Sequence, residues 1–149
     1  MRIYLCAFVL FISFVLGCFK QSNDKNSLRS ADFYYEFVKA LIKNNQSEMQ
    51  PIYTVFQRIY ADYNNENKTF DCIEAVFSEL KGIGIDEKEI ILLKEYTNAG
   101  AAELSDCSER LVISAESEQK NRLSLYQKQG RSAILLYPCI AALIILVIV

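Results

Sequence analysis

The hydrophobic pattern of the chain changes twice between its two ends. Apolar residues run almost without interruption from Ile3 to Leu16 and again from Ala133 to Val149, whereas between these runs they recur every three or four positions. A spacing of three and four places apolar residues on one face of a helix and leaves the opposite face polar. The pattern therefore predicts amphipathic helices in the middle and a segment without a polar face at each end.

Five amphipathic helices are predicted from start signals and apolar stripes. The start signals, in chain order, are Ser30, the Ser47–Gln50 capping box, Thr69, the Asp86–Glu89 capping pair, and Ala101 or Ala102. The stripes comprise Phe33, Phe37 and Leu41, then Val55, Phe56 and Tyr60, then Phe70, Val76 and Leu80, then Leu92, Leu93 and Tyr96, and last Leu104, Cys107 and Leu111. The sequence shows no strand-like alternation and no internal repeat.

The predicted fold is all-α, a small bundle of four to five amphipathic helices flanked by an N-terminal signal peptide and a C-terminal hydrophobic segment. Past Ala115 the apolar pattern thins, which indicates a frayed helix or a stalk. The predicted organisation is a signal peptide (1–18), a polar linker (19–29), a helical domain (30–115), a polar basic stalk (116–132) and a hydrophobic membrane-anchor segment (133–149).

The first apolar run fits the core of a signal peptide. It follows one positive charge, Arg2, and is too short for a comfortable membrane span. Val15 and Gly17 match the small-residue pattern for cleavage before Cys18, and cleavage after Cys18 fits nearly as well. The alternatives are an uncleaved anchor and a lipoprotein, because "VLGC" resembles a bacterial lipobox, which would make Cys18 the lipid attachment site. Leu16 departs from that motif, where a small residue is usual.

The last 17 residues, 133–149, carry no charge and contain one proline, Pro138. As a helix they reach about 25 Å against a hydrocarbon core of about 30 Å, so they form a short membrane anchor with Arg131 extending toward the headgroups. A GPI signal is the alternative, because a signal peptide and an apolar tail are the layout of a GPI precursor. The residues at the expected spacing before the tail, Asn121 and Arg122, do not supply the small residues of an attachment site.

The basic flank of the tail gives a conflicting signal about topology. Lys120, Arg122, Lys128 and Arg131 precede the tail, and no acidic residue follows Glu118. Positive charges beside a membrane segment favour the cytosolic side. We give the signal peptide more weight, so the helical domain is expected to be lumenal or extracellular, at the cell surface or a secretory-pathway membrane.

Two cysteines and two sequons extend this secretory interpretation. Cys72 and Cys107 lie near the starts of two predicted helices, and in an oxidising compartment we predict a disulfide between them. In the cytosol they would be reduced core cysteines instead. Asn45 in "NQS" and Asn67 in "NKT" are sequons in predicted loops, which makes them candidate glycosylation sites.

Composition restricts the chemistry. The chain has 16 basic and 18 acidic residues and no histidine. A slightly acidic chain lacks the basic face that a general nucleic-acid binder needs, so no nucleic-acid partner is expected. Without histidine, Ser–His and Cys–His nucleophile pairs and histidine-ligated metals are excluded. We predict no catalytic residues, no metal site and no cofactor, and the chain is not expected to be an enzyme.

The function predicted from these features is presentation of a small helical domain at a membrane. The C-terminal segment provides the membrane contact, and the domain is expected to contact another protein that the sequence does not identify. The alternative is a carrier of a small apolar ligand, because the many Phe and Tyr residues could line a cavity inside the bundle. An enclosed apolar cavity would favour the carrier.

Overall fold

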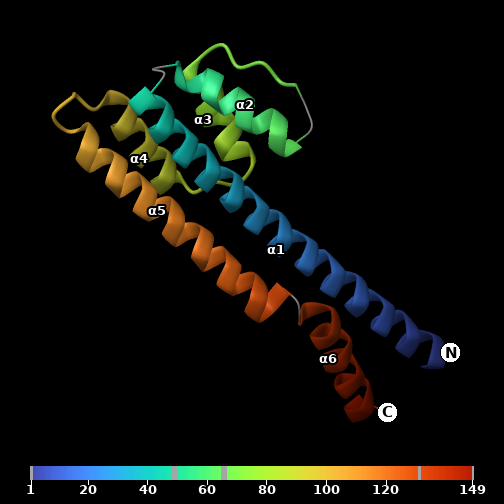
Figure 1. The fold of residues 1–149 in the computed structure, drawn as a ribbon. Coiled ribbons are helices and arrows are strands. Elements are labelled where there is room, and N and C mark those ends of the chain that lie inside the picture. The colour runs from blue at the N-terminus through green and yellow to red at the C-terminus, as the bar shows by residue number, and fades with distance from the viewer. Residues whose placement is uncertain (1, 48–49, 65–66, 131, 149) are drawn as a thin grey trace. The chain divides into compact units, whose positions relative to one another are not determined.

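The structure is a computed structural model that describes residues 2–47, 50–64, 67–130 and 132–148. These residues form six α-helices and one π-helical turn, with no strand among them (Figure 1). The all-α prediction is therefore confirmed, with more helices than the four to five predicted for the bundle. The chain divides into two compact units, unit 1 (Met1–Leu28 and Asn121–Val149) and unit 2 (Arg29–Lys120).

The first helix, α1, spans Arg2–Ser47 and contributes to both units. Between Phe19 and Ser47 the sequence contains neither proline nor glycine, so nothing interrupts the helix. Lys20 and Asp24, one turn apart, add an ion pair of 2.9 Å. The predicted polar linker 19–29 is consequently helical. The prediction that a helix starts at Ser30 is wrong, since this residue lies inside α1.

Helix α2 spans Ile52–Asn64 and begins directly after Pro51. The Pro51 carbonyl accepts a hydrogen bond from the Thr54 N–H at 3.0 Å, as expected for a proline at the edge of a first turn. Ser47 is the last residue of α1. The predicted capping box that begins at Ser47 is therefore wrong, and residues 48–49 of that stretch lie outside the described residues.

Helix α3 spans Ile73–Gly82, and its N-cap is Cys72 instead of the predicted Thr69. Helix α3 ends at Gly82, and Gly84 follows in the turn, as is common at helix C-termini. Gly84 has a φ of +84°, a conformation that glycine adopts without a steric cost. The turn brings the N–H of Ile85 to the carbonyl of Leu80 at 3.0 Å, which satisfies a carbonyl of the last helical turn.

Helix α4 spans Glu87–Asn98, and α5 spans Leu104–Leu125, so α5 crosses from unit 2 into unit 1. The π-helical turn η1 (Tyr126–Gly130) and α6 (Ala133–Ile148) follow. Most of the predicted stalk is therefore helical, because its glutamate, glutamine, lysine and arginine residues are strong helix formers even without an apolar stripe. Sequence periodicity could not show this.

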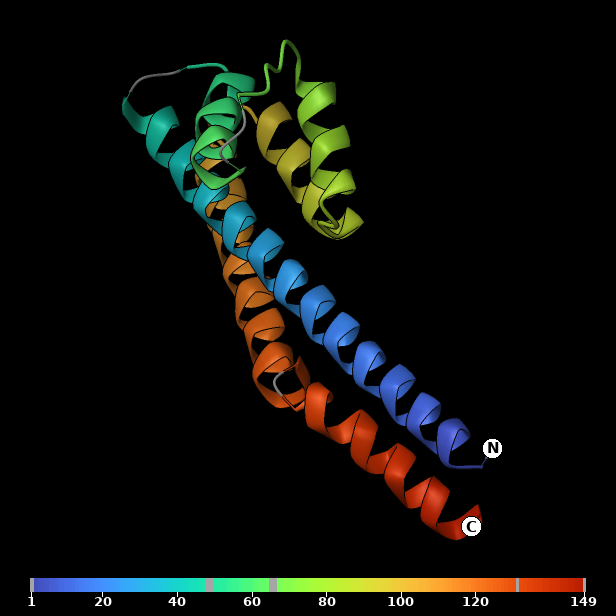
Figure 2. The same cartoon turned by 90° about the vertical axis from the view of Figure 1, so that its right-hand side faces the viewer.

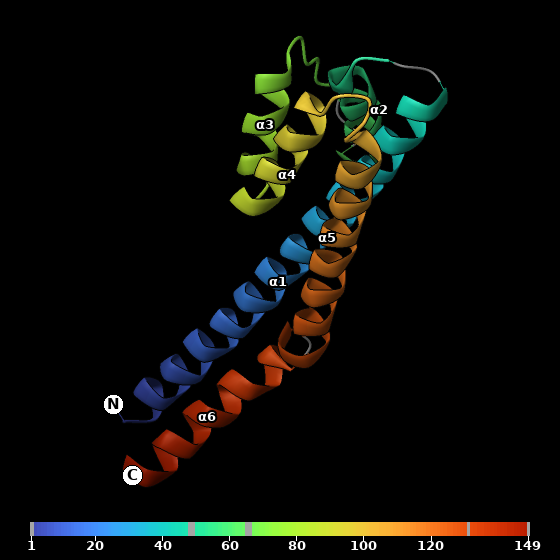
Figure 3. The ribbon, with the colours of Figure 1, turned by 90° about the vertical axis from the view of Figure 1, so that its left-hand side faces the viewer.

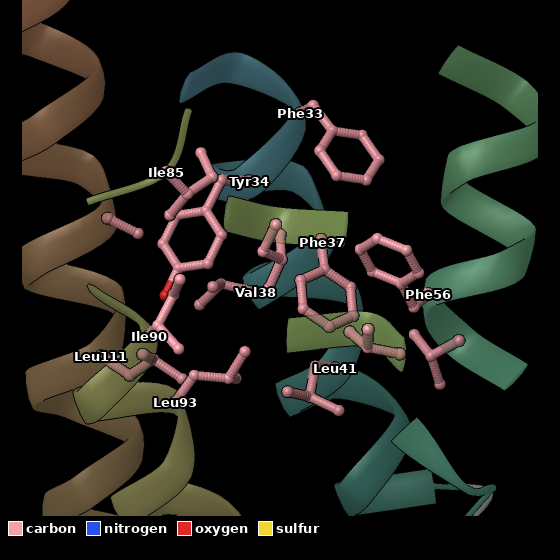
Figure 4. Close-up of a cluster of buried hydrophobic side chains, with 14 of the residues drawn as sticks. Phe33, Tyr34, Phe37, Val38, Leu41, Phe56, Ile85, Ile90, Leu93 and Leu111 are labelled. Carbon is pink, nitrogen blue, oxygen red and sulfur yellow. The ribbon is translucent and has the colours of Figure 1, made fainter. Parts of the chain in front are cut away.

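The core of unit 2 is built around aromatic residues of α1 and α2 (Figure 4). Phe56 is fully buried and meets Phe33, Phe37 and Phe70 edge to face, with ring centroids 5.5, 5.1 and 4.9 Å apart. Leucine, isoleucine and valine side chains of α3, α4 and α5 complete the cluster. Its fully buried members from those helices are Val76, Leu80, Ile90, Leu93 and Leu111.

Candidate functional site

The largest exposed apolar surface lies in unit 1. We call it the apolar hairpin and define it as Cys6–Phe19 of α1 together with Leu135–Ile145 of α6. Its exposed large side chains, eight from α1 and six from α6, are Phe8, Leu10, Phe11, Ile12, Phe14, Val15, Leu16, Phe19, Leu135, Leu136, Tyr137, Ile140, Leu143 and Ile144. The exposed positions include consecutive residues, so they surround each helix and do not form a single stripe.

The two arms of the apolar hairpin run alongside each other in opposite chain directions (Figure 2, Figure 3). Both belong to unit 1. At the inner end, Arg122 donates to the Ser27 carbonyl at 3.3 Å and to its hydroxyl at 3.1 Å. Further out, Tyr137 lies close enough to Lys20 to interact with it electrostatically. These contacts place the outer ends of both arms at the same end of unit 1.

The length and composition of α1 are sufficient for it to cross a membrane, and it is the one helix of the described chain that meets this requirement. A signal sequence meets the same requirement. Leu135–Ile145 of α6 is a shorter apolar helical stretch. The coarse prediction of an apolar N-terminal helix is thus confirmed. Cys18 lies half-buried within α1. Signal cleavage and lipid attachment at this residue stay predictions. Arg131, which was expected to extend toward the headgroups, lies outside the described residues.

A groove opens on the surface of unit 2. It has a volume of about 470 Å³ and is open to solvent. Its apolar lining consists of Leu41, Ile52, Ile73, Ala99, Ala101 and Leu104, and its polar lining of Asn44, Asn45, Gln50, Tyr96 and Thr97. We call it the Asn44 groove. A second hollow of about 480 Å³, between α1, α2 and α5, is also open, so neither is the enclosed cavity expected of a carrier.

Asn44 is the unusual residue of this groove. It is 5% exposed, and its Nδ2 donates to the Gln50 carbonyl at 3.0 Å. Its Oδ1 is buried and has no hydrogen-bond partner among the described residues. A buried carbonyl oxygen without a partner costs about 1–3 kcal/mol. Asn44 is therefore an incompletely satisfied polar group beside the groove, and its buried Oδ1 could accept a hydrogen bond from an occupant only after a local rearrangement.

The two sequons have different surroundings. Asn45 lies in α1, where its Nδ2 donates to the Tyr96 hydroxyl at 3.0 Å. A glycan on that nitrogen would disturb this contact, which forms part of the Asn44 groove. Asn67 is exposed in the connection between α2 and α3. Of the two residues, Asn67 is the more accessible.

The predicted disulfide between Cys72 and Cys107 is wrong. The five cysteines are free thiols, and none lies at disulfide distance from another. Cys72 is exposed at the N-cap of α3, whereas Cys107 is partly buried against the core from α5. Both cysteines lie near the start of a helix, but this does not bring their sulfur atoms together, because α3 packs against α2 and α4.

Glu89 is the polar residue that sequence analysis misinterpreted. Asp86 is the N-cap of α4, as predicted, but no side-chain cap hydrogen bond forms, so the capping pair is wrong. Glu89 is instead 4% exposed, and its Oε1 accepts a hydrogen bond of 2.5 Å from Ser114 of α5. Its Oε2 is buried without a partner among the described residues. The Tyr34 hydroxyl donates to the Glu89 carbonyl at 3.0 Å.

The environment of Glu89 disfavours its charged form. Burial raises the pKa of its carboxyl group above the ordinary value, the hydrogen bond from Ser114 offsets this in part, and the nearby Glu118 raises the pKa further. Burial also raises the pKa of Tyr34. No hollow among those described includes Glu89 in its lining. It is a buried carboxylate in the core and not part of an accessible site.

Glu79 of α3 shows the opposite behaviour. Burial alone would raise the pKa of its carboxyl group, but hydrogen bonds from Lys68 and Tyr60 outweigh burial and leave the pKa below the ordinary value. The two contacts measure 2.5 Å to Lys68 and 2.9 Å to Tyr60. This cluster ties the segment before α3 to α2, and it contributes to folding without forming a cavity.

Within the described ranges, no group of three or more Cys, Asp and Glu residues is placed to hold a metal ion. No protein family, curated protein or solved structure matches this chain. The functional argument therefore rests on the apolar hairpin and the Asn44 groove.

Proposed function

We propose that this chain is a membrane-anchored protein that holds a small helical domain, unit 2, at a membrane for contact with another protein. The observation that carries the proposal is the exposure of apolar side chains around both arms of the apolar hairpin. Phe8, Phe11 and Leu135 are 62%, 66% and 72% exposed. Residues of these types are normally buried in water-soluble proteins.

The energy involved favours a lipid environment over water. Burying the exposed part of one such side chain contributes about 1 kcal/mol, so the exposed side chains of the apolar hairpin together amount to on the order of 10 kcal/mol. That is comparable to the whole stability of a typical domain. A bilayer supplies the missing apolar surroundings, and the helical hydrogen bonds already satisfy the backbone of each arm.

The contact function is assigned to the Asn44 groove. A protein segment that enters the groove would place apolar side chains against Ile52, Ile73 and Leu104. A small apolar ligand is the second candidate, and it is less well supported because the groove is open and nearly half polar in its lining residues. The anchoring alternatives from sequence, a GPI anchor and a lipid on Cys18, stay predictions.

Alkaline carbonate extraction of membranes from cells that express the full chain tests the anchoring. We expect the wild type to stay with the membrane pellet. The double variant Phe11→Lys, Leu143→Lys should move into the soluble fraction, whereas Ile113→Lys, at an exposed apolar position of unit 2, should behave like the wild type. Extraction of the wild type by carbonate would overturn the proposal.

Site-specific photo-crosslinking tests the contact. A photoreactive residue placed at the groove position Thr97 should give a discrete adduct in intact cells. The same residue at the exposed position Glu109 of α5 is the matched control. Equal adducts at both positions, or none at Thr97, would contradict a role for the groove.

A further inference from the structure

We infer that the apolar hairpin is retained in the mature protein and enters the bilayer from the cytosolic face, so that unit 2 lies in the cytosol. The partner of this surface is a lipid bilayer with an anionic cytosolic leaflet. The inference rests on the proposed anchoring function and adds orientation and retention of the first segment to it. It is opposite to the lumenal orientation expected from the sequence.

The charge distribution supports entry from the cytosolic side. Both arms leave the apolar hairpin toward basic segments: residues 19–29 contain Lys20, Lys25 and Arg29, and residues 120–131 contain Lys120, Arg122, Lys128 and Arg131. Before Ile3 the chain supplies one basic residue, Arg2. Basic residues near membrane segments are retained in the cytosol, where anionic lipids attract them.

The described parts of these two basic segments that belong to unit 1 meet at one place. The contact between Arg122 and Ser27 links them directly, and Lys20 lies near Tyr137 of the other arm. Their charges therefore add at one end of the apolar hairpin. The acidic residue in this place, Asp24, is paired with Lys20 at 2.9 Å, and acidic residues contribute little to orientation.

The longer helical segments that carry the two arms match each other in length. The apolar part of α1 from Ile3 to Phe19 extends about 25 Å as a helix, and α6, with 16 residues, extends about 24 Å. Two segments of equal reach that run in opposite directions enter the membrane to the same depth from one side. A hairpin of this kind needs both arms, which is the reason to expect that the first arm is not removed.

The continuity of α1 argues in the same direction. The positions expected for signal cleavage, Gly17 and Cys18, lie inside a helix that continues to Phe33 and Phe37 of the unit 2 core. Cleavage there would remove seven of the eight exposed large apolar side chains of this arm and leave only Phe19. The fold of unit 2 does not require this arm, but the apolar hairpin does.

The chemistry of unit 2 fits a reducing compartment. Cys72 and Cys107 are free thiols, and thiols persist in the cytosol, whereas secreted domains of this size commonly use disulfides. The Asn45 amide donates a hydrogen bond to the Tyr96 hydroxyl, and a glycan on this nitrogen would disturb that contact. Both observations are expected for a domain that never enters the secretory lumen.

The exposed thiol of Cys72 reports the orientation directly. The full chain is translated in the presence of sealed ER-derived microsomes, whose outer face corresponds to the cytosol, and treated with a membrane-impermeant maleimide-polyethylene glycol. We expect the same Cys72-dependent mass shift in intact microsomes and after detergent, with no shift in Cys72→Ser at this thiol. Carbonate extraction of the same microsomes reports anchoring separately.

Two further readings complete the test. The wild type should be insensitive to endoglycosidase, and the mature chain should still contain the peptide with Cys6. Cys72 labelling that requires detergent, a glycan lost in Asn67→Gln, or removal of the first arm would each overturn this inference while leaving the anchoring intact. Release of the wild type by carbonate would instead overturn the proposed function.

Discussion

The two units use the same residue types in opposite ways. Phe33 and Phe56 of unit 2 are 1% and 0% exposed, whereas Phe8 and Phe11 of unit 1 are 62% and 66% exposed. Both pairs lie on regular α-helices. What differs is the spacing of apolar residues, which recur every three or four positions in unit 2 and almost continuously in unit 1.

The two regions have the same secondary structure and differ in what surrounds their apolar side chains. A helix with one apolar face finds its partners in the same chain and forms a core that excludes water. A helix that is apolar on all sides cannot be covered by the few helices of a small chain. Unit 2 therefore supplies its own apolar environment, and under the proposed function unit 1 takes it from the membrane.

The largest effect is expected from truncating the core of unit 2. Phe56→Ala removes a ring that meets four other aromatic rings, so it should lower the free energy of unfolding of unit 2 by about 3–5 kcal/mol. Phe11→Ala removes the same ring from unit 1 and should leave this value unchanged. Urea titration of the full chain in lipid nanodiscs, followed by tyrosine fluorescence, compares them. A loss of similar size in Phe11→Ala would erase the distinction between the units.

An introduced lysine should be costly in the apolar hairpin and almost without cost on the surface of unit 2. Phe11→Lys places a lysine in the apolar hairpin, which costs about 2.5–3.5 kcal/mol on insertion at the centre of a bilayer. Ile113→Lys makes the same change at a position of unit 2 that is 57% exposed and should cost close to nothing. The measurement is the membrane-inserted fraction in microsomes. If both variants insert like the wild type, the apolar hairpin is not in the bilayer.

A smaller, pH-dependent effect is expected at Glu89. Because its folded-state pKa lies above the ordinary 4.5, the native state binds the proton more tightly than the unfolded state, and stability falls as pH rises from 4.5 through the raised pKa. Glu89→Gln removes this dependence and should be more stable than the wild type by about 1 kcal/mol at neutral pH. Urea titrations from pH 4 to pH 8 measure it. The exposed Glu109→Gln serves as control, and a pH dependence that persists in Glu89→Gln would contradict the assignment.

The smallest effect is expected at Glu79, with the opposite sign. Its folded-state pKa lies below the ordinary 4.5, so its contribution is present above that value and is lost as pH falls through the folded-state pKa. Lys68→Gln removes one partner and should cost about 0.5 kcal/mol at neutral pH, because the pair is partly exposed. Lys39→Gln, which breaks the exposed pair with Glu36, should cost less. An equal cost in both variants would show that the Glu79 cluster contributes nothing special.

Hydrophobic periodicity predicted the helical class and the core residues Phe33, Phe37 and Phe56, and the capping signal predicted the N-cap Asp86. It missed the uninterrupted helix through 19–29, because polar residues with high helix propensity carry no apolar stripe. The contacts of Glu89 and the lining of the Asn44 groove were less predictable. The partner of Glu89 is Ser114, 25 positions further along the chain, and no local signal distinguishes that contact from a capping interaction. The Asn44 groove likewise combines residues from 41 to 104, whose proximity only the fold creates.

The most direct test of the account uses two native thiols. Cys72 in unit 2 and Cys139 in the apolar hairpin are both exposed on the protein surface, so a water-soluble maleimide would label both if water surrounded both units. With the full chain in sealed vesicles that present unit 2 to the reagent, the account predicts labelling at Cys72 and none at Cys139 until detergent and denaturant are added. Equal labelling of Cys139 and Cys72 in intact vesicles would contradict it.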